Sequence, residues 1–342
     1  MAEKDLPAAI DAVINKQDLD PSFMRSVMRT IMKGEATQAQ IGAFLVGLRM
    51  KGESVGEIAA AAEVMRELAA GVELSDLPHT VDIVGTGGDA SSSFNISTTS
   101  MFVAAAAGCH VAKHGNRAVS SKSGSADVLE AAGIKLDLTP VQVKQCVEEI
   151  GVGFMFAPMH HSAMKHAVGP RKELGVRTVF NLLGPLTNPA SAPNQVLGVY
   201  SDQWVLPLAE VLQKLGSDHV MVVHSEDGMD EISISAPTKV AELKSGEIHE
   251  YVIEPEQFGL TRTDSSKILV SNVEESLAMM KSVLANESGA ALDIVLLNAG
   301  AAIYVAGIVD DLRFGIERAR QIIASGEAEQ KLASLIEITN SI

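Results

Sequence analysis

One stretch limits the possible folds of this chain more than any other. Residues 81–84 are a short apolar, mostly β-branched run, which predicts a buried strand. Three glycines and an acid follow within residues 85–89, then a cluster of hydroxyl side chains, then an alanine-rich helical pattern from Thr99. A strand that enters a helix through a glycine loop presents backbone N–H groups to an anion. We therefore expect a phosphate-binding loop here.

A plain tight turn is the alternative for the same stretch. The glycine spacing matches neither the P-loop pattern nor the dinucleotide-binding pattern. Glycine-rich turns between a strand and a helix also occur without any ligand. The loop alone therefore leaves both possibilities open.

Strand and helix patterns alternate from residue 81 onward. The strand candidates are 81–84, 109–112, 135–138, 153–157, 196–200 and 219–224. This alternation predicts an α/β fold, with a mostly parallel central sheet and helices on both faces. Ligands of such sheets bind beyond the carboxyl ends of the strands. Residues 240–253 predict an antiparallel hairpin around Ser245 and Gly246, and helices are predicted over 288–307 and 309–325.

The N-terminal part predicts helices only. Thr37 with Gln40, and Ser54 with Glu57, have capping-box spacing, and each pair precedes a helical apolar stripe. We expect a small all-helical domain over residues 1–72 and a larger α/β domain over residues 73–342. The helical, polar and basic stretch of about residues 162–187 interrupts the alternation, so we expect it to rejoin the helical domain.

Composition narrows the class of protein. A chain of 342 residues suits two domains with a large core. Its formal net charge of -16 argues against nucleic acid and anionic membranes as partners, and means that an anionic ligand needs a local cluster of donors. Two cysteines in apolar patterns indicate free thiols. With neither a signal peptide nor a membrane span apparent, we expect a soluble cytoplasmic protein.

A second polar loop follows the predicted strand 109–112. Lys113, His114, Asn116 and Arg117 are followed closely by several serines, which together can form a second anion cradle. A solvated polar loop is the alternative. We favour the ligand, because so acidic a protein gathers few cations in one loop without a counter-charge.

Asp230 and Glu231 lie in the loop beyond strand 219–224. Paired carboxylates suit Mg²⁺, which binds one or two carboxylates together with waters and substrate phosphates. Asp89 and Ser97 are further oxygen candidates near the metal. A solvated acid pair is the alternative, and only the predicted position beside two anion cradles outweighs it. Arg171, in the basic helical stretch, can hold a carboxylate with both of its terminal nitrogens.

Six motifs occur in one order: Gly85-Thr86-Gly87-Gly88-Asp89, Asn95-Ile96-Ser97-Thr98, Lys113-His114-Gly115-Asn116-Arg117, Ser123-Gly124-Ser125-Ala126-Asp127, a run from Asn181 to Pro189, and Asp230-Glu231. In these motifs, over almost its whole length, the chain resembles the anthranilate phosphoribosyltransferases. The related pyrimidine nucleoside phosphorylases share that fold. The resemblance implies transfer of the phosphoribosyl group of 5-phosphoribosyl 1-diphosphate to anthranilate, in tryptophan biosynthesis, with Mg²⁺ as cofactor.

The resemblance also implies roles for single residues. The phosphoribosyl diphosphate site would comprise Gly85, Gly88, Asp89, Ser93, Asn95, Ile96, Ser97, Thr98, Lys113, His114, Gly115, Asn116, Arg117, Ala118, Val119, Ser120, Ser121 and Ser125. The anthranilate site and its channel would comprise Gly85, His114, Asn116, Pro158, His161 and Arg171. Ser97, Asp230 and Glu231 would bind Mg²⁺, and Lys113, Asn116 and Asp89 would stabilise the transition state.

Four positions depart from the pattern of the family. Ala90 replaces a usual glycine, Ser93 a common threonine, Ser162 a proline and Lys165 an arginine. These changes bear on the shape of the loop and on the entry of anthranilate, and not on the type of reaction.

Two rival functions belong to the same fold. A nucleoside phosphorylase would use inorganic phosphate and would not need the acid pair or the second cradle. A non-catalytic or nucleic-acid-binding relative conflicts with the net charge and with the intact motifs. The methionine-rich apolar helices of the N-terminal domain further suggest a homodimer formed through that domain.

Overall fold

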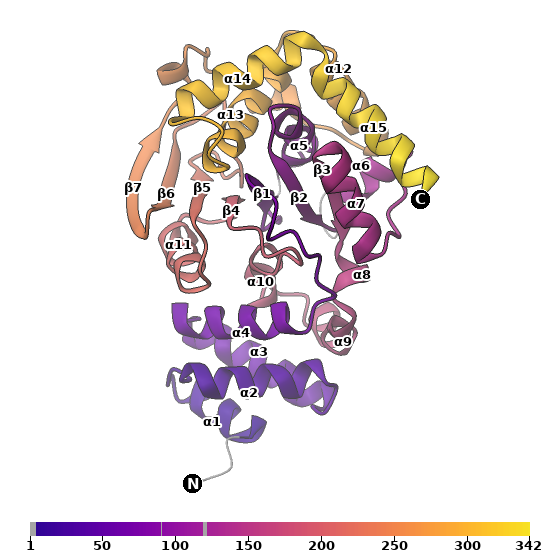
Figure 1. Ribbon diagram of the computed structural model, residues 1–342. Coiled ribbons are helices and arrows are strands. Elements are labelled where there is room, and N and C mark those ends of the chain that lie inside the picture. The colour runs from indigo at the N-terminus through magenta and orange to yellow at the C-terminus, as the bar shows by residue number, and fades with distance from the viewer. Residues whose placement is uncertain (1–4, 90, 119–121) are drawn as a thin grey trace.

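The computed structural model describes residues 5–89, 91–118 and 122–342 and shows a helical bundle stacked against an α/β domain (Figure 1). The N-terminal bundle contains α1 (Leu6–Ile14), α2 (Pro21–Met32), α3 (Gln38–Lys51) and α4 (Val55–Glu67). No strand lies within residues 5–79. The predicted fold class, a helical N-terminal domain followed by a larger α/β domain, is confirmed.

Local signals in the sequence set the ends of the bundle helices. The Asp20 side chain accepts a 3.0 Å hydrogen bond from the Phe23 amide, and Pro21 occupies the first turn of α2. Thr37 and Ser54 begin α3 and α4 with complete capping boxes. These caps satisfy amides that the helix itself leaves free, so each helix begins where the sequence predicts.

The α/β domain is built on one seven-stranded sheet. In chain order the strands are β1 (Thr80–Gly85), β2 (His110–Gly115), β3 (Val152–Phe156), β4 (Asn194–Gly198), β5 (His219–Ser225), β6 (Thr238–Lys244) and β7 (Glu247–Ile253). Their spatial order is β3-β2-β1-β4-β5-β6-β7. The first five are parallel, and β6 and β7 form the predicted antiparallel hairpin at one edge.

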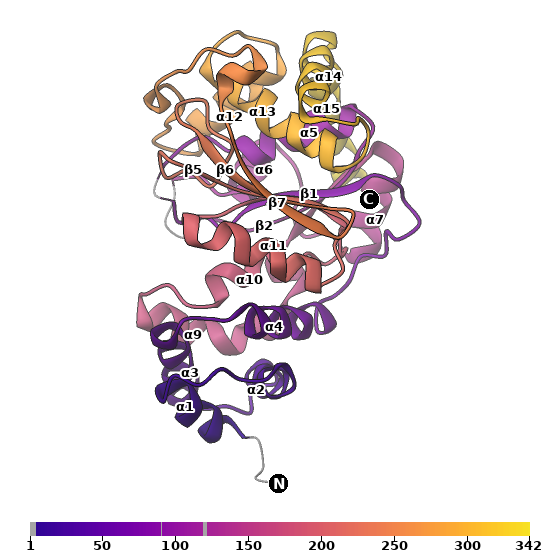
Figure 2. The ribbon, with the colours of Figure 1, turned by 90° about the vertical axis from the view of Figure 1, so that its left-hand side faces the viewer.

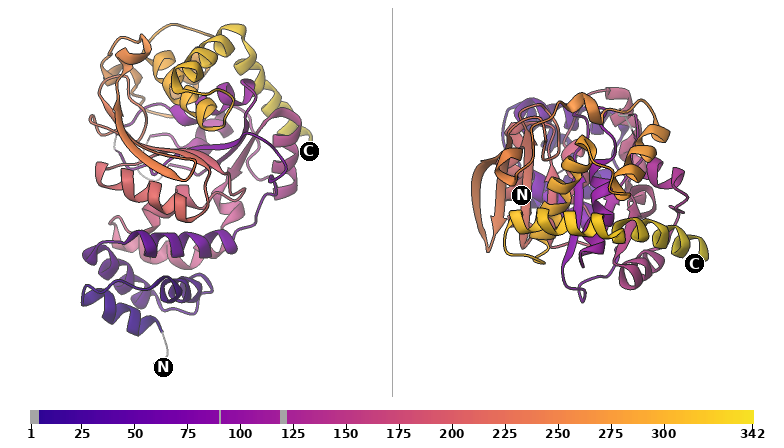
Figure 3. Two further views of the ribbon diagram at one scale, coloured as in Figure 1. Left: turned by 60° about the vertical axis from the view of Figure 1, so that its left-hand side comes forward. Right: turned by 90° about the horizontal axis from the view of Figure 1, so that it is seen from above.

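Helices cover both faces of the sheet (Figures 2 and 3). One core joins the sheet to α5 (Ile96–Ala106), α6 (Ser125–Ala131), α7 (Pro140–Ile150), α12 (Val273–Leu284), α13 (Ala290–Val305), α14 (Leu312–Ser325) and α15 (Glu327–Ser341). Side chains alternate along β4: Val196 enters this core, whereas Leu197 enters a second core on the opposite face.

The second core is continuous with the helical bundle. It joins one sheet face to α11 (Val205–Lys214), α10 (Phe180–Leu186) and the interior of α1–α4. After the short α8 (Ala157–His160), α9 (Lys165–Leu174) packs on α2 and α3 and buries Ala167 in the same core. This packing supports the proposal that residues 162–187 belong with the helical domain. Among the described residues, no helix is both long and apolar enough to cross a bilayer.

The predicted strand 135–138 is wrong. Leu136 and Leu138 are buried as the alternating pattern requires, but the segment is an extended connection between α6 and α7. The Lys135 amide donates to the Thr339 hydroxyl on α15, at 3.3 Å, and not to a neighbouring strand. Alternation therefore reflects packing against one core here, and the sheet ends at β3.

Candidate functional site

A cavity of about 700 Å³ lies at the carboxyl ends of β1 and β2 and faces α9 and α10. Every predicted site residue that the structure describes lines this cavity. They are Gly85, Gly88, Asp89, Ser93, Asn95, Ile96, Ser97, Thr98, Lys113, His114, Gly115, Asn116, Arg117, Ala118, Ser125, Pro158, His161, Arg171, Asp230 and Glu231. The predicted residues Val119, Ser120 and Ser121 lie outside the described residues, as does Ala90.

The glycine loop after β1 lies directly on the acidic loop after β5. Gly87 and Gly88 have φ values of 66° and 78°, in the left-handed region that glycine adopts without strain. The Gly87 amide donates to Asp230 Oδ2 at 2.7 Å. A Cβ placed on Gly85 would lie 2.5 Å from that same oxygen, so only glycine allows this approach.

Asn95 joins the two predicted anion cradles. Its Oδ1 accepts hydrogen bonds of 2.7 Å from both the Ser123 and the Ser276 hydroxyls, and its Nδ2 donates to the Ser123 carbonyl. Asn95 therefore holds the start of α5 against the second loop. Ser97 and Thr98 lie in the first turn of α5, where free amides and the helix dipole favour an anion.

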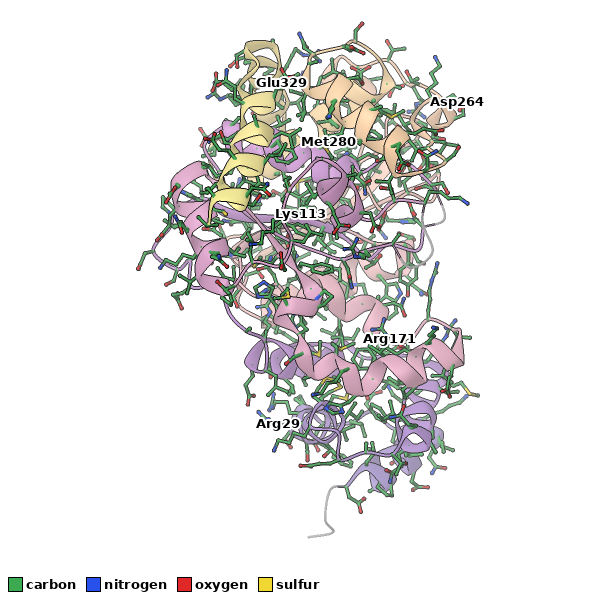
Figure 4. The ribbon with its side chains drawn as sticks, turned by 90° about the vertical axis from the view of Figure 1, so that its right-hand side faces the viewer. Arg29, Lys113, Arg171, Asp264, Met280 and Glu329 are labelled. Atoms are coloured by element: carbon green, nitrogen blue, oxygen red, sulfur yellow. The ribbon has the colours of Figure 1, made fainter. Side chains whose placement is uncertain are left out.

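Lys113, labelled in Figure 4, is buried in the α/β domain and lines the cavity. Its Nζ donates to the Ser97 hydroxyl at 3.1 Å and to the Ile83 carbonyl. Burial lowers the pKa of Lys113, whereas the charges of Asp82, Glu231 and Asp230 oppose that shift. A single buried ammonium thus faces several carboxylates.

The acid pair is buried among like charges. Burial, together with the nearby charge of Asp89, raises the pKa of Asp230 to about 7. Burial and the charge of Asp230 likewise raise the pKa of Glu231. Such a cluster favours a bound proton or a cation, because two close carboxylates do not both ionise readily without a counter-charge.

In the second polar loop, which follows β2, the guanidinium of Arg117 points toward α6 and away from the centre of the cavity. Arg117 Nη1 lies 2.7 Å from Glu130 and 3.1 Å from Asp127, both on α6. The Ala118 amide donates to Asp127 at 2.9 Å, and the Ser125 hydroxyl donates to the Asn116 carbonyl at 3.2 Å. The structure thus places Arg117 at the cavity but pairs its guanidinium with acids on α6.

The opposite side of the cavity carries aromatic and cationic groups. The rings of His114 and His161 meet edge to face with centroids 5.0 Å apart. Burial lowers the pKa of His114 to about 3 and that of His161 to about 4, so both are neutral at physiological pH. The Nε2 atom of each has no partner within the described part of the chain. Arg171 lies on α9, where Figure 4 labels it, 5.1 Å above the Phe180 ring.

Two buried residues behind the cavity, Asp82 and Asn188, were not predicted as part of the site. Asp82 lies in the middle of β1. Its carboxylate accepts a hydrogen bond of 2.7 Å from the Asn188 side-chain amide and one of 3.3 Å from the His114 backbone amide. The signal was present in the sequence, because an acid in the middle of an apolar strand needs a buried partner. Asn181 and Thr187 also line the cavity without having been assigned a role.

Comparison with known proteins agrees with this geometry. Residues 7–69 match the helical bundle domain, and residues 77–329 the α/β domain, of a glycosyl transferase family. The chain is 63% identical to an anthranilate phosphoribosyltransferase of Thioalkalivibrio sulfidiphilus, over 98% of this chain and 99% of that protein.

Solved structures agree with these matches. The crystal structure of anthranilate phosphoribosyltransferase from Thermus thermophilus is 44% identical, with a TM-score of 0.92, over 97% of this chain and 99% of that one. The Saccharomyces cerevisiae enzyme in complex with PRPP and Mg is 27% identical, with a TM-score of 0.90, over 100% of this chain and 99% of that one. The chain belongs to the anthranilate phosphoribosyltransferase family.

Proposed function

We propose that this chain transfers the phosphoribosyl group of 5-phosphoribosyl 1-diphosphate to the amine of anthranilate, as a step of tryptophan biosynthesis. The C1–oxygen bond to diphosphate breaks, the C1–nitrogen bond forms, and the nitrogen then releases one proton to solvent. The observation that carries the proposal is that two anion cradles, the acid pair and Arg171 line one and the same cavity. Membership of the family supports it.

The residues present fit Mg²⁺. Asp230, Glu231 and Ser97 offer oxygen atoms only, which are the ligands that this hard cation prefers. Burial and the charges of neighbouring acids, Asp89 for Asp230 and Asp230 for Glu231, raise the pKa values of both acids, which means that a positive charge beside them would be stabilised. When bound, Mg²⁺ would neutralise charge on the diphosphate and assist its departure.

The chain's own groups act on the leaving diphosphate. In the proposal, the amides of the glycine loop and of the first turn of α5 bind its oxygens, with Ser93, Asn95 and Thr98 at the rim. Lys113 supplies a positive charge where negative charge grows as the C1–oxygen bond lengthens, and Asn116 and Asp89 hold the sugar. Donors fixed before the reaction stabilise the transition state without reorganising.

The acceptor is positioned and not deprotonated in advance. Arg171 binds the carboxylate of anthranilate, while Pro158, His161 and His114 line its approach. His114 is neutral because burial lowers its pKa to about 3, so Nε2 can accept a hydrogen bond from the amine. The arylamine is itself neutral, so orientation, worth about 7–11 kcal/mol in favourable cases, can replace a strong base. Attack opposite to the departing diphosphate inverts C1.

A fluorescence assay of anthranilate tests this function. Purified protein should consume anthranilate only when the phosphoribosyl donor and Mg²⁺ are both present. Phosphorolysis of a nucleoside by inorganic phosphate, with anthranilate untouched, would instead identify a nucleoside phosphorylase.

We also propose that the protein is a cytoplasmic homodimer that associates through its helical domain. Ile14 at the end of α1 is 65% exposed and Met50 on the neighbouring α3 is 78% exposed, so these two helices offer apolar side chains to a second copy of the chain. Sedimentation at micromolar concentration should give twice the chain mass, and a monomer would contradict the dimer.

A further inference from the structure

We propose that Arg177 is a positioning residue that holds the glycine loop of residues 85–89 in its diphosphate-binding shape from the connection between α9 and α10. The inference rests on the transferase function proposed above. Arg177 does not line the cavity, whereas Gly88 and Asp89 do. Its hydrogen bond to the Gly88 carbonyl therefore connects Arg177 to the donor site through the loop.

The first contact is with the backbone of the loop. Arg177 Nη2 donates to the Gly88 carbonyl. Because the peptide group is planar and trans, its C=O and N–H point in opposite directions. Holding the Gly88 carbonyl on Arg177 therefore turns the Asp89 amide away from the arginine and leaves it free for an anion in the cavity. Gly88 has a φ of 78°, and glycine is flexible enough to need such a restraint.

The second contact fixes the guanidinium itself. It lies 4.1 Å from the centroid of the Tyr200 ring, a cation–π geometry. The Tyr200 amide donates to the Thr86 hydroxyl at 3.0 Å, and Trp204 Nε1 donates to the Tyr200 hydroxyl at 3.0 Å. Tyr200 is thus tied to the beginning of the same glycine loop, so Arg177 and Tyr200 grip the loop at two points.

The third contact links the loop to the helical domain. Arg49 on α3 donates to the Arg177 carbonyl. Arg177 follows the left-handed Gly175 that ends α9, the helix that carries Arg171, and the next residue, Thr178, donates to Asn181 at the start of α10. The donor loop and the acceptor helix are therefore joined through a few residues.

Arg177→Met tests the role, with Arg313→Met as the matched control. Arg313 is also exposed and also donates to a backbone carbonyl, that of Gln257 at 2.7 Å, but neither residue lines the cavity. We expect Arg177→Met to raise the KM and the Kd of the phosphoribosyl diphosphate about tenfold, as for loss of a charged hydrogen bond, with a smaller change in kcat. The control should leave both values unchanged.

Tyr200 variants separate positioning from direct contact. Tyr200→Leu should raise the donor KM in the same direction, and Tyr200→Phe, which keeps the ring, should not. A raised donor KM in Arg177→Met alone, with Tyr200→Leu like the wild type, would indicate direct contact with the donor and overturn the proposal. An unchanged donor Kd, by calorimetry with Mg²⁺, in folded Arg177→Met would also overturn it. Neither result bears on the proposed transferase function, which the anthranilate fluorescence assay of the wild-type protein tests separately.

Discussion

The carboxylate of Asp82 and the side-chain amide of Asn188 form a buried hydrogen bond of 2.7 Å between β1 and the segment that follows α10. The same Asn188 amide donates to the Ala112 carbonyl at 2.9 Å, and the second Asp82 oxygen accepts from the His114 amide. The pair therefore ties together β1, β2 and the chain that returns from the helical domain. The strands concerned are those whose ends carry both cradles.

Ionisation of Asp82 should make stability depend on pH. Burial raises the pKa of Asp82 from its ordinary value of 3.8 to about 6, and the charge of Lys113 partly opposes this shift. A raised pKa means that the folded state favours the protonated form of Asp82. The resulting contribution to the free energy of unfolding is therefore complete below about pH 4, and it is lost as the pH rises through about 6. Relative to Asp82→Asn, the wild type should lose about 3 kcal/mol of unfolding free energy over that range.

Urea unfolding of both proteins across this pH range measures the difference. Parallel pH profiles would show that Asp82 does not titrate in the folded state. The Asn188 amide is also expected to matter more above about pH 6, where it faces a charged acid.

The acid pair should be essential for turnover. Asp230→Asn combined with Glu231→Gln is expected to lower kcat/KM by at least about 10²-fold and to abolish its dependence on Mg²⁺. The reason is that the two carboxylates supply the negative charge that would bind Mg²⁺. Glu226→Gln is the control, since Glu226 is exposed in the same loop and does not line the cavity. Wild-type rates for the double variant at limiting Mg²⁺ would remove both residues from the metal site.

Gly85 should not tolerate a side chain. In Gly85→Ala the new Cβ would meet Asp230 Oδ2 at 2.5 Å, so the Asp230 carboxylate must leave its present position, at a cost of about 1–3 kcal/mol. We expect a raised KM for the phosphoribosyl donor. Gly42→Ala on α3 is the control: apart from the adjoining backbone of its own helix, no atom lies within 4 Å of its added Cβ, so it should instead stabilise the helix by about 0.5–1 kcal/mol. Equal donor KM values in the two variants would contradict the close approach.

Local patterns predicted the parts of this fold that local forces determine. Capping residues and apolar spacing located α2, α3 and α4, and turn residues located the hairpin of β6 and β7. The glycine loop was found because left-handed backbone restricts the residue type to glycine. The helices α12 and α15, which complete one core, were not among the predicted elements.

Long-range pairing limited the prediction elsewhere. Residues 135–138 alternate like a strand, but no local pattern shows whether a neighbouring strand is present. Arg117 was expected to face an anion, yet α6 supplies Glu130 and Asp127 as nearer partners. The contacts of Asn188 with Asp82, and of Arg177 with Gly88, join residues 106 and 89 positions apart, a separation at which residue type alone does not identify a partner.

Both cysteines should resist modification in the native protein. Burial raises the pKa of Cys109 to about 12 and that of Cys146 to about 11, so the reactive thiolate is a very small fraction at neutral pH. Ellman's reagent should react with neither thiol in the folded protein and with both after denaturation. Rapid reaction in the native state would show that one of them is accessible.

Arg171 should set the affinity for anthranilate. It faces the cavity from α9, and burial lowers the pKa of its guanidinium without removing the charge. Arg171→Ala removes a charged partner of the acceptor carboxylate, a loss worth about 1.5–3 kcal/mol, so the KM for anthranilate should rise about 10- to 100-fold while the donor KM changes little.

Lys172→Ala is the control for this prediction. Lys172 is an exposed cation on the same helix, so its loss should leave both KM values unchanged. Arg171→Lys keeps the charge but loses the planar fork, so it should recover only part of the affinity. Steady-state kinetics with each substrate varied in turn would decide: an unchanged KM for anthranilate in Arg171→Ala would mean that the carboxylate binds elsewhere in the cavity.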